Sequence, residues 1–228
     1  MLRNIFFDID DTLLDFVKAE SVALRSALGS FGIELSDELI EKYSRINSLQ
    51  WEKLERGELS REEVLVSRFE IFFKELGITC SAFEAQKRYE YLLGVGHWFI
   101  DGAPELLEAL YGRYRLYIVS NGTKSVQDRR IESAGIGKYF DGIFISQCIG
   151  ADKPQSEFFS RCFAQIEDFK KEESIILGDR LSSDILGGIN AGIKTCWFNP
   201  KNEPAREGIV PDYEIKKLAE FPELIGGL

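Results

Sequence analysis

Short runs of apolar residues that end in polar side chains recur along this chain, and they predict the strands of a buried sheet. The first run, at residues 4–9, is apolar at Ile5, Phe6, Phe7 and Ile9. A run of this kind suits a strand that is buried on both faces. It breaks into the acidic sequence D-I-D-D-T at 8–12, where the strand is expected to end. Charged side chains at the end of a buried strand are unfavourable unless they have a functional role.

From residue 102 onward, similar runs alternate with stretches of helical periodicity. The pattern predicts helices over 104–112, 123–134, 155–166 and 182–191, and strands near 116–120 and over 142–146, 174–178 and 194–198. Short strands separated by such helices are typical of right-handed βαβ units in a parallel sheet. The run at 4–9 has the same character, so we expect it to join that sheet.

The intervening residues are expected to be helical throughout. Apolar side chains recur at helical spacing in 64–76 and are followed by Gly77, a typical helix end, and similar helices are predicted over 15–31, 37–56 and 81–95. The predicted fold is therefore a Rossmann-like parallel α/β core, formed by residues 1–14 and 101–228. An all-helical cap at 15–100 is inserted into it.

Composition restricts the partners that this chain can have. With 228 residues, 44% of them hydrophobic, the chain can bury a sizeable core, and we expect a cytoplasmic protein because neither a long apolar run nor a basic leader is present. The net charge of -10 argues against nucleic acid as a partner, although a small anion can bind at one locally positive site. The four scattered cysteines, with a single histidine, predict free thiols rather than a zinc site or disulfides.

Two carboxylates stand at the end of the first strand. Asp8 and Asp10 are two residues apart, so in extended geometry they leave the same face of the strand and can share a cation. Neighbouring carboxylates repel each other, and Mg²⁺ is a common partner for ligands that are all oxygens. Taken alone, the pair is better interpreted as solvated aspartates that cap a strand, and the cation site needs support from the rest of the chain.

Other strands of the predicted sheet also end in polar residues. In an open parallel sheet, ligands bind beyond the carboxyl ends of the strands. There the aspartates would hold a divalent cation and the remaining side chains would hold an anion, so that a phosphoryl group fits between them. The residues are Asp8, Asp10, Asp179 and Asp184 for the cation, and Ser120, Asn121 and Lys153 for the anion.

The order of these residues resembles the haloacid dehalogenase-like superfamily of Mg²⁺-dependent phosphotransferases. Its four motifs are matched by D-I-D-D-T at 8–12, S-N-G at 120–122, K-P at 153–154 and G-D-R-L-S-S-D at 178–184. The segment 184–199, R-F-E at 68–70 and the stretch around Trp51 are similar to the bacterial pyrimidine 5'-nucleotidase branch often called YjjG. Arg180 departs from the pattern, and it could add a cation near the metal or pair with Asp184.

The resemblance implies a covalent mechanism. Asp8 would attack the phosphorus and form an aspartyl-phosphate, while Asp10 would protonate the leaving oxygen and later deprotonate the attacking water. Mg²⁺ would be bound by Asp8, Asp179 and the backbone carbonyl of Asp10, and Asp184 would orient these ligands.

The resemblance also implies how the phosphoryl group is held. Lys153 would spread the charge of the transferring group, and Ser120 with the amide of Asn121 would fix its oxygens. A simpler interpretation of Lys153 is a surface lysine before a turn proline. Trp51, Arg68 and Phe69 in the cap are candidates for substrate specificity, with Tyr89 as a further stacking surface, although aromatic residues on helices are more often core.

The leading hypothesis is a phosphatase that acts on a pyrimidine nucleoside 5'-monophosphate, a small-molecule phosphomonoester. The alternative is a phosphatase or phosphomutase for sugar phosphates or other small phosphometabolites. Carbon–halogen hydrolysis on this fold lacks the second aspartate of the first motif, and a non-catalytic binding protein would be expected to have lost one of the four motif residues. The sequence leaves open whether the protein is a monomer or a homodimer.

Overall fold

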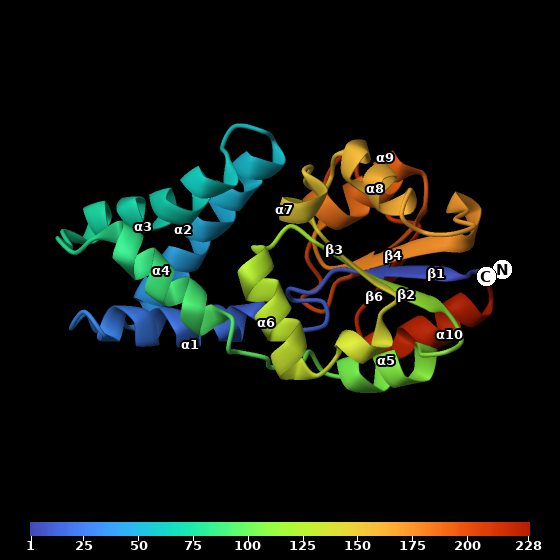
Figure 1. The fold of residues 1–228 in the computed structure, drawn as a ribbon, viewed down its shortest axis with the longest axis horizontal. Coiled ribbons are helices and arrows are strands. Elements are labelled where there is room, and N and C mark those ends of the chain that lie inside the picture. Colours follow the sequence, from blue (N-terminus) through green and yellow to red (C-terminus); the bar gives the residue numbers. More distant parts are fainter.

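A six-stranded parallel sheet forms the centre of the structure, a computed structural model that describes residues 1–228 (Figure 1). The strand order is β3-β2-β1-β4-β5-β6, and every neighbouring pair is parallel. The strands are β1 (Asn4–Phe7), β2 (Arg115–Ser120), β3 (Gly142–Ile145), β4 (Ser174–Gly178), β5 (Lys194–Phe198) and β6 (Tyr213–Ile215). The predicted α/β fold is confirmed; only β6, three residues long, had no clear apolar run.

Successive residues of β1 pack on opposite faces of the sheet, which explains why the strand is apolar without alternation. Ile5 and Phe7 belong to the cluster on one face, together with Leu116 and Ile118 of β2. Phe6 belongs to the cluster on the other face and stacks on Tyr117 at 5.1 Å. The sheet is therefore buried on both sides, as the pattern predicted.

Helices cover both faces of this sheet. Apolar side chains of α5 (Ala103–Leu110), α6 (Lys124–Ala134) and α10 (Phe221–Gly226) join one cluster, and those of α8 (Ser156–Phe163) and α9 (Leu186–Ala191) join the other. Short helical segments are α7 (Ser146–Ile149) and the 3₁₀ turns Gly137–Tyr139, Lys171–Glu173 and Leu218–Glu220. The helix predicted at 182–191 begins as a π-helical turn, Leu181–Ile185, before α9.

Between β1 and β2 the chain forms four helices that share a hydrophobic cluster of their own. These are α1 (Phe16–Gly29), α2 (Asp37–Glu55), α3 (Arg61–Leu76) and α4 (Ala82–Leu93), close to the predicted positions. Asp15, Ser36, Ser60 and Ser81 each cap a helix by accepting a hydrogen bond from a backbone N–H in its first turn. The group lies to one side of the sheet, and α6 stands between them (Figure 1).

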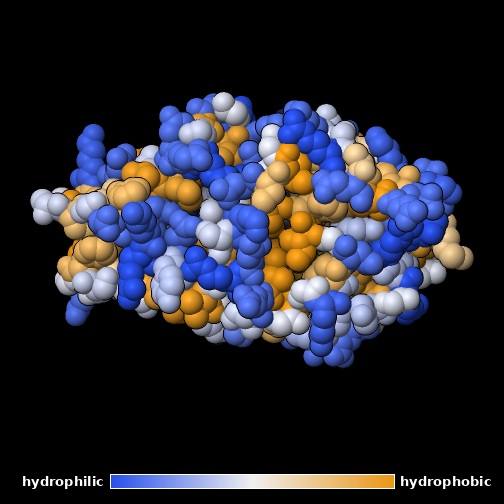
Figure 2. All heavy atoms as spheres, in the orientation of Figure 1, coloured by the Kyte–Doolittle hydropathy of each residue, from blue (hydrophilic) through white to orange (hydrophobic).

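The molecular surface is mostly hydrophilic on the face shown in Figure 2, with an apolar strip near the middle, close to where β3 lies. Ile143 of this edge strand is 41% exposed. Among the helices, none has the length and apolar character that a membrane span requires.

Candidate active site

A cavity of about 290 Å³ opens between the four helices and the carboxyl edge of the sheet. Its lining includes all seven core residues that the sequence singled out, namely Asp8, Asp10, Ser120, Asn121, Lys153, Asp179 and Asp184. The ends of β1, β2 and β4 and the segment after β3 place them there, because parallel strands present their carboxyl ends at one edge. The residues are far apart in sequence and share one small volume.

Three carboxylates form a compact group in this cavity. Asp8, Asp179 and Asp184 each offer an oxygen, and the three oxygens lie within 4.8 Å of one another. Burial raises the pKa of Asp8 to about 7, against the opposing charge of Lys153. Burial, and then the charges of Asp8 and Asp184, raise the pKa of Asp179 well above its usual range. Oxygen ligands with unmet negative charge fit a hard divalent cation such as Mg²⁺.

The position of Asp184 is fixed by close packing at the end of β4. Gly178 leaves space for it, since a Cβ at this glycine would lie 2.4 Å from an Asp184 carboxylate oxygen. Asp184 accepts hydrogen bonds from the Arg180 backbone N–H at 3.0 Å and from Lys153 Nζ at 2.7 Å. The strand-end pattern had included Asp184 among the aspartates for a cation, while the family resemblance implied that it only orients the ligands; its carboxylate lies in the cluster itself.

Lys153 is buried among these carboxylates, so the interpretation as a surface lysine is wrong. It is 1% exposed, and its Nζ donates to Asp8 at 2.7 Å and to the Val119 carbonyl at 2.8 Å, as well as to Asp184. Burial works to lower the pKa of Lys153, but the charges of Asp184 and Asp8 outweigh it and the pKa is raised. The side chain is therefore a fixed cation beside Asp8.

Asp10 points away from the cluster, toward α6. Its two carboxylate oxygens accept hydrogen bonds from Arg130 and from Gln127 Nε2, the latter at 2.6 Å. Gln127 also donates to Ser120 Oγ at 2.9 Å, and Arg130, which is 0% exposed, donates to the Gly96 carbonyl. Sequence reasoning missed both residues; their spacing of three on the helix after S-N-G was the only signal.

Asn121 connects two of the motifs. Its side chain accepts from the Lys153 backbone N–H at 2.8 Å and donates to the Lys153 carbonyl at 2.9 Å. Ser120 Oγ accepts from the Gly122 N–H at 3.0 Å. These bonds fix the loop after β2 against the segment that carries Lys153, so the polar groups around Asp8 are held in place.

Two polar contacts join the helices to the sheet loops. Arg61 of α3 donates a hydrogen bond to Ser146 Oγ at 2.6 Å and forms a salt bridge with Asp152. Its guanidinium also makes a cation–π contact with the Trp51 ring. Glu55 of α2 accepts from Ser182 Oγ at 2.9 Å and pairs with the Arg180 side chain at 3.4 Å. The alternative in which the Arg180 side chain pairs with Asp184 is therefore wrong, since Arg180 bonds to Asp184 only through its backbone: its N–H donates to the Asp184 carboxylate and its carbonyl accepts from the Asp184 N–H.

The specificity candidates of the helices fall into two groups. Trp51 and Arg68 line the cavity, and Arg68 donates to Asn47 at 2.8 Å and to Gln86 at 2.7 Å. Phe69 and Tyr89 are 0% exposed inside the four-helix cluster, where they pack on each other at 5.5 Å. The expectation that these two rings meet a ligand is wrong, because they form the helical core.

Comparisons with known proteins agree with this geometry. Residues 5–198 match the family model of haloacid dehalogenase-like hydrolases. The chain is 39% identical to the HAD-hydrolase YfnB of Bacillus subtilis, covering 98% of this chain and 95% of that protein. It is 35% identical to the pyrimidine 5'-nucleotidase PynA of Streptococcus pneumoniae (93% and 90% covered) and 30% identical to the pyrimidine 5'-nucleotidase YjjG of Escherichia coli (97% and 96% covered).

A crystal structure of YfnB superimposes on this chain with a TM-score of 0.94, at 38% identity and with 98% of each chain covered. That crystal contains magnesium and is described as showing interdomain movement. The similarity thus extends over the sheet and the four helices alike.

Proposed function

This chain belongs to the haloacid dehalogenase-like hydrolases and is a phosphatase, and we propose that it is a Mg²⁺-dependent phosphomonoesterase for pyrimidine nucleoside 5'-monophosphates. The observation that carries the proposal is the cluster of Asp8, Asp179 and Asp184, with Lys153 bonded to Asp8 and Asp184, which faces a cavity that the four helices close. Two relatives named as pyrimidine 5'-nucleotidases support the substrate class.

Asp8 is the proposed nucleophile. Its free oxygen attacks the phosphorus, the bond from phosphorus to the ester oxygen breaks, and an aspartyl-phosphate forms. The charge of Lys153 favours the anionic form of Asp8 through the 2.7 Å hydrogen bond, against the burial that raises the pKa of Asp8, and Lys153 with Ser120 offers hydrogen bonds to the phosphoryl oxygens. A divalent cation held by Asp8, Asp179 and the Asp10 carbonyl, beside Asp184, would neutralise negative charge on the transferring group.

Asp10 is the proposed general acid and base. It gives a proton to the departing ester oxygen and then takes one from the water that attacks the aspartyl-phosphate. The bond between phosphorus and Asp8 breaks in this second step, which regenerates the Asp8 carboxylate and frees inorganic phosphate. Its side chain is 28% exposed, so it can exchange protons with solvent between steps. Arg130 and Gln127 fix where this carboxylate stands.

The four helices, with residues 15–100 as their bounds, are proposed to act as a cap. Only a phosphoryl group is recognised at the sheet edge, so discrimination between phosphomonoesters falls to the helices that line the other side of the cavity. The contacts of Arg61 and Glu55 hold the cap over the sheet loops and limit the access of water.

Phosphate release from UMP, dUMP, dTMP and glucose 6-phosphate, measured with Mg²⁺ and then with EDTA, tests the proposal. We expect the nucleotides to exceed glucose 6-phosphate by at least about tenfold in kcat/KM, which needs about 1.4 kcal/mol of differential transition-state binding. Trp51→Ala and Arg68→Ala should each reduce the ratio of kcat/KM for UMP to kcat/KM for p-nitrophenyl phosphate. A preference for glucose 6-phosphate would refute the nucleotidase assignment, and relocation of phosphate without release would indicate a phosphomutase.

A further inference from the structure

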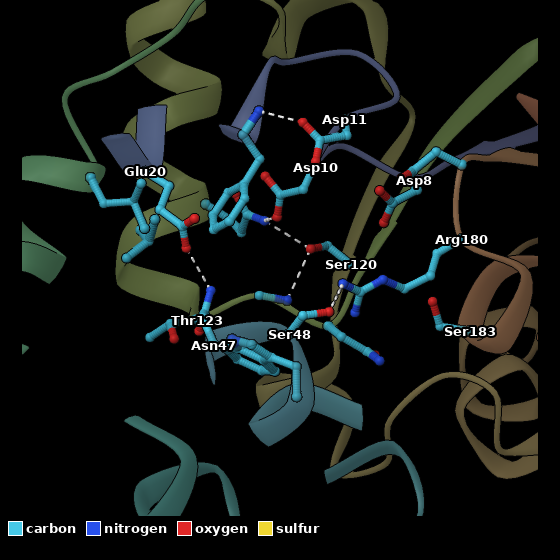
Figure 3. Close-up of a pocket in the computed structure, with 18 of the residues that line it drawn as sticks. Asp8, Asp10, Asp11, Glu20, Asn47, Ser48, Ser120, Thr123, Arg180 and Ser183 are labelled. Atoms are coloured by element: carbon cyan, nitrogen blue, oxygen red, sulfur yellow. Dashed lines mark hydrogen bonds between the residues drawn. The ribbon is translucent and has the colours of Figure 1, made fainter. Parts of the chain in front are cut away.

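A buried carboxylate lies in the cap side of the cavity, away from the catalytic aspartates. Glu20 of α1 lines the cavity and is 2% exposed. It accepts hydrogen bonds from Asn47 Nδ2 at 2.7 Å and from Ser44 Oγ, both on α2. Figure 3 shows Glu20 and Asn47 on the opposite side of the site from Asp8, Arg180 and Ser183.

Glu20 has unused capacity to accept hydrogen bonds. An ionised carboxylate can accept about four, and each of its oxygens here accepts only one. No lysine or arginine forms a salt bridge with it, and burial raises its pKa, against the lowering effects of the Ser44 hydrogen bond and the nearby charge of Arg68. A carboxylate buried without an ion pair is costly, which favours a ligand as its missing partner.

Asn47 supplies a donor next to this acceptor. It is 4% exposed, and its Nδ2 carries a second hydrogen beyond the one given to Glu20. Its Oδ1 accepts from Arg68 at 2.8 Å, and Arg68 is held in turn by Gln86 at 2.7 Å. This chain of bonds fixes the amide, so that a preorganised acceptor and donor stand side by side near Trp51, which lines the same cavity.

We propose that Glu20 and Asn47 bind the edge of the pyrimidine base. Uracil and thymine present N3–H beside a carbonyl oxygen, and cytosine presents an amino N–H beside N3, so each offers an adjacent donor and acceptor in one plane. Glu20 accepts the N–H, and Asn47 donates to the neighbouring acceptor. This assignment rests on the proposed function, because it requires a nucleotide in the cavity.

The test compares kcat/KM for UMP, dUMP and ribose 5-phosphate in the wild-type protein and in Glu20→Gln. The variant keeps the shape of the side chain but exchanges one acceptor oxygen for a donor, so the ratio of UMP to ribose 5-phosphate should fall about tenfold, and that of dUMP equally. Asn47→Asp, which still pairs with Arg68, should lower both ratios too. Glu38→Gln, the same exchange at an exposed position of α2, should leave them unchanged.

The outcomes separate two kinds of failure. A wild-type protein without preference for UMP over ribose 5-phosphate would refute the proposed function and this inference with it. A preference that persists in both folded variants, checked by their melting temperatures, would overturn the inference alone. A loss for UMP without a loss for dUMP would show that Glu20 contacts the 2'-hydroxyl, and it would overturn the assignment to the base.

Discussion

Replacing Arg130 with methionine should separate the placement of Asp10 from the rest of catalysis. Arg130 is 0% exposed and pairs with Asp10, whose side chain is 28% exposed. The guanidinium also donates to the Gly96 carbonyl and lies 5.7 Å from the centre of the Phe16 ring. Methionine retains much of the volume and removes the charge and every donor.

The cost in stability follows from the burial of this pair. Removing one partner of a fully buried ion pair costs about 3–5 kcal/mol. Because water can reach Asp10, we expect about 2 kcal/mol, which corresponds to a fall in Tm of about 4–8 °C for a chain of this size. Gln127 still holds the second carboxylate oxygen at 2.6 Å, so Asp10 should be misplaced rather than released.

The cost in activity depends on the leaving group. A general acid contributes about 10²–10⁴-fold when the departing oxygen is strongly basic, as in a nucleoside. The nitrophenolate of p-nitrophenyl phosphate leaves without a proton. We expect kcat/KM to fall about 100-fold for UMP. For p-nitrophenyl phosphate the loss should be smaller by a factor of at least about ten, because kcat/KM for this substrate reports only the first chemical step, in which the leaving group needs no proton.

Steady-state kinetics on both substrates, with Arg129→Met as the control, decides the question. Arg129 is on the same helix, donates to the Ser125 carbonyl and does not contact Asp10. Equal losses on the two substrates would refute the reasoning, because they would reflect general damage rather than a misplaced acid.

Four further outcomes are expected. Asp8→Asn should lower phosphate release by about 10³-fold or more without lowering Tm, because an amide cannot form the acyl phosphate; activity above a few per cent would contradict this. Mg²⁺ should raise the midpoint temperature of unfolding in calorimetry, because binding at about 100 times its Kd adds about 2.7 kcal/mol to the free energy of unfolding. An unchanged midpoint would argue against the carboxylate site. Arg61→Met should loosen the contact between helices and sheet, seen as a larger radius of gyration by X-ray scattering and a higher KM for UMP; an unchanged radius would remove its role in closure. Glu20→Gln should raise Tm at pH 8, and the gain should shrink as the pH falls toward the ordinary glutamate pKa. A carboxyl whose pKa is raised in the folded protein costs stability as the pH rises, so a gain independent of pH would refute this.

Local patterns were sufficient to predict β1 to β5 of the sheet, though not the short β6, and the polar residues at its edge. Ile5, Phe6 and Phe7 are all apolar because consecutive side chains of β1 enter cores on opposite faces. The same reasoning placed Lys153 and Asp179 beside Asp8, since parallel strands bring their carboxyl ends together whatever their distance in sequence. Helix bounds followed from serines at the starts and glycines near the ends, which satisfy backbone groups locally.

Tertiary packing decided the direction in which each side chain points and the partner that it finds. Arg68 and Phe69 are adjacent on α3, yet one lines the cavity and the other fills the core, because the neighbouring helices determine which face is covered. Arg180 pairs with Glu55, 125 residues away, rather than with nearby Asp184. Asp10 turns to Arg130 and leaves Asp184 to complete the carboxylate group. Such pairings depend on how segments distant in sequence pack against each other, and this packing cannot be inferred from the spacing of residues along the chain.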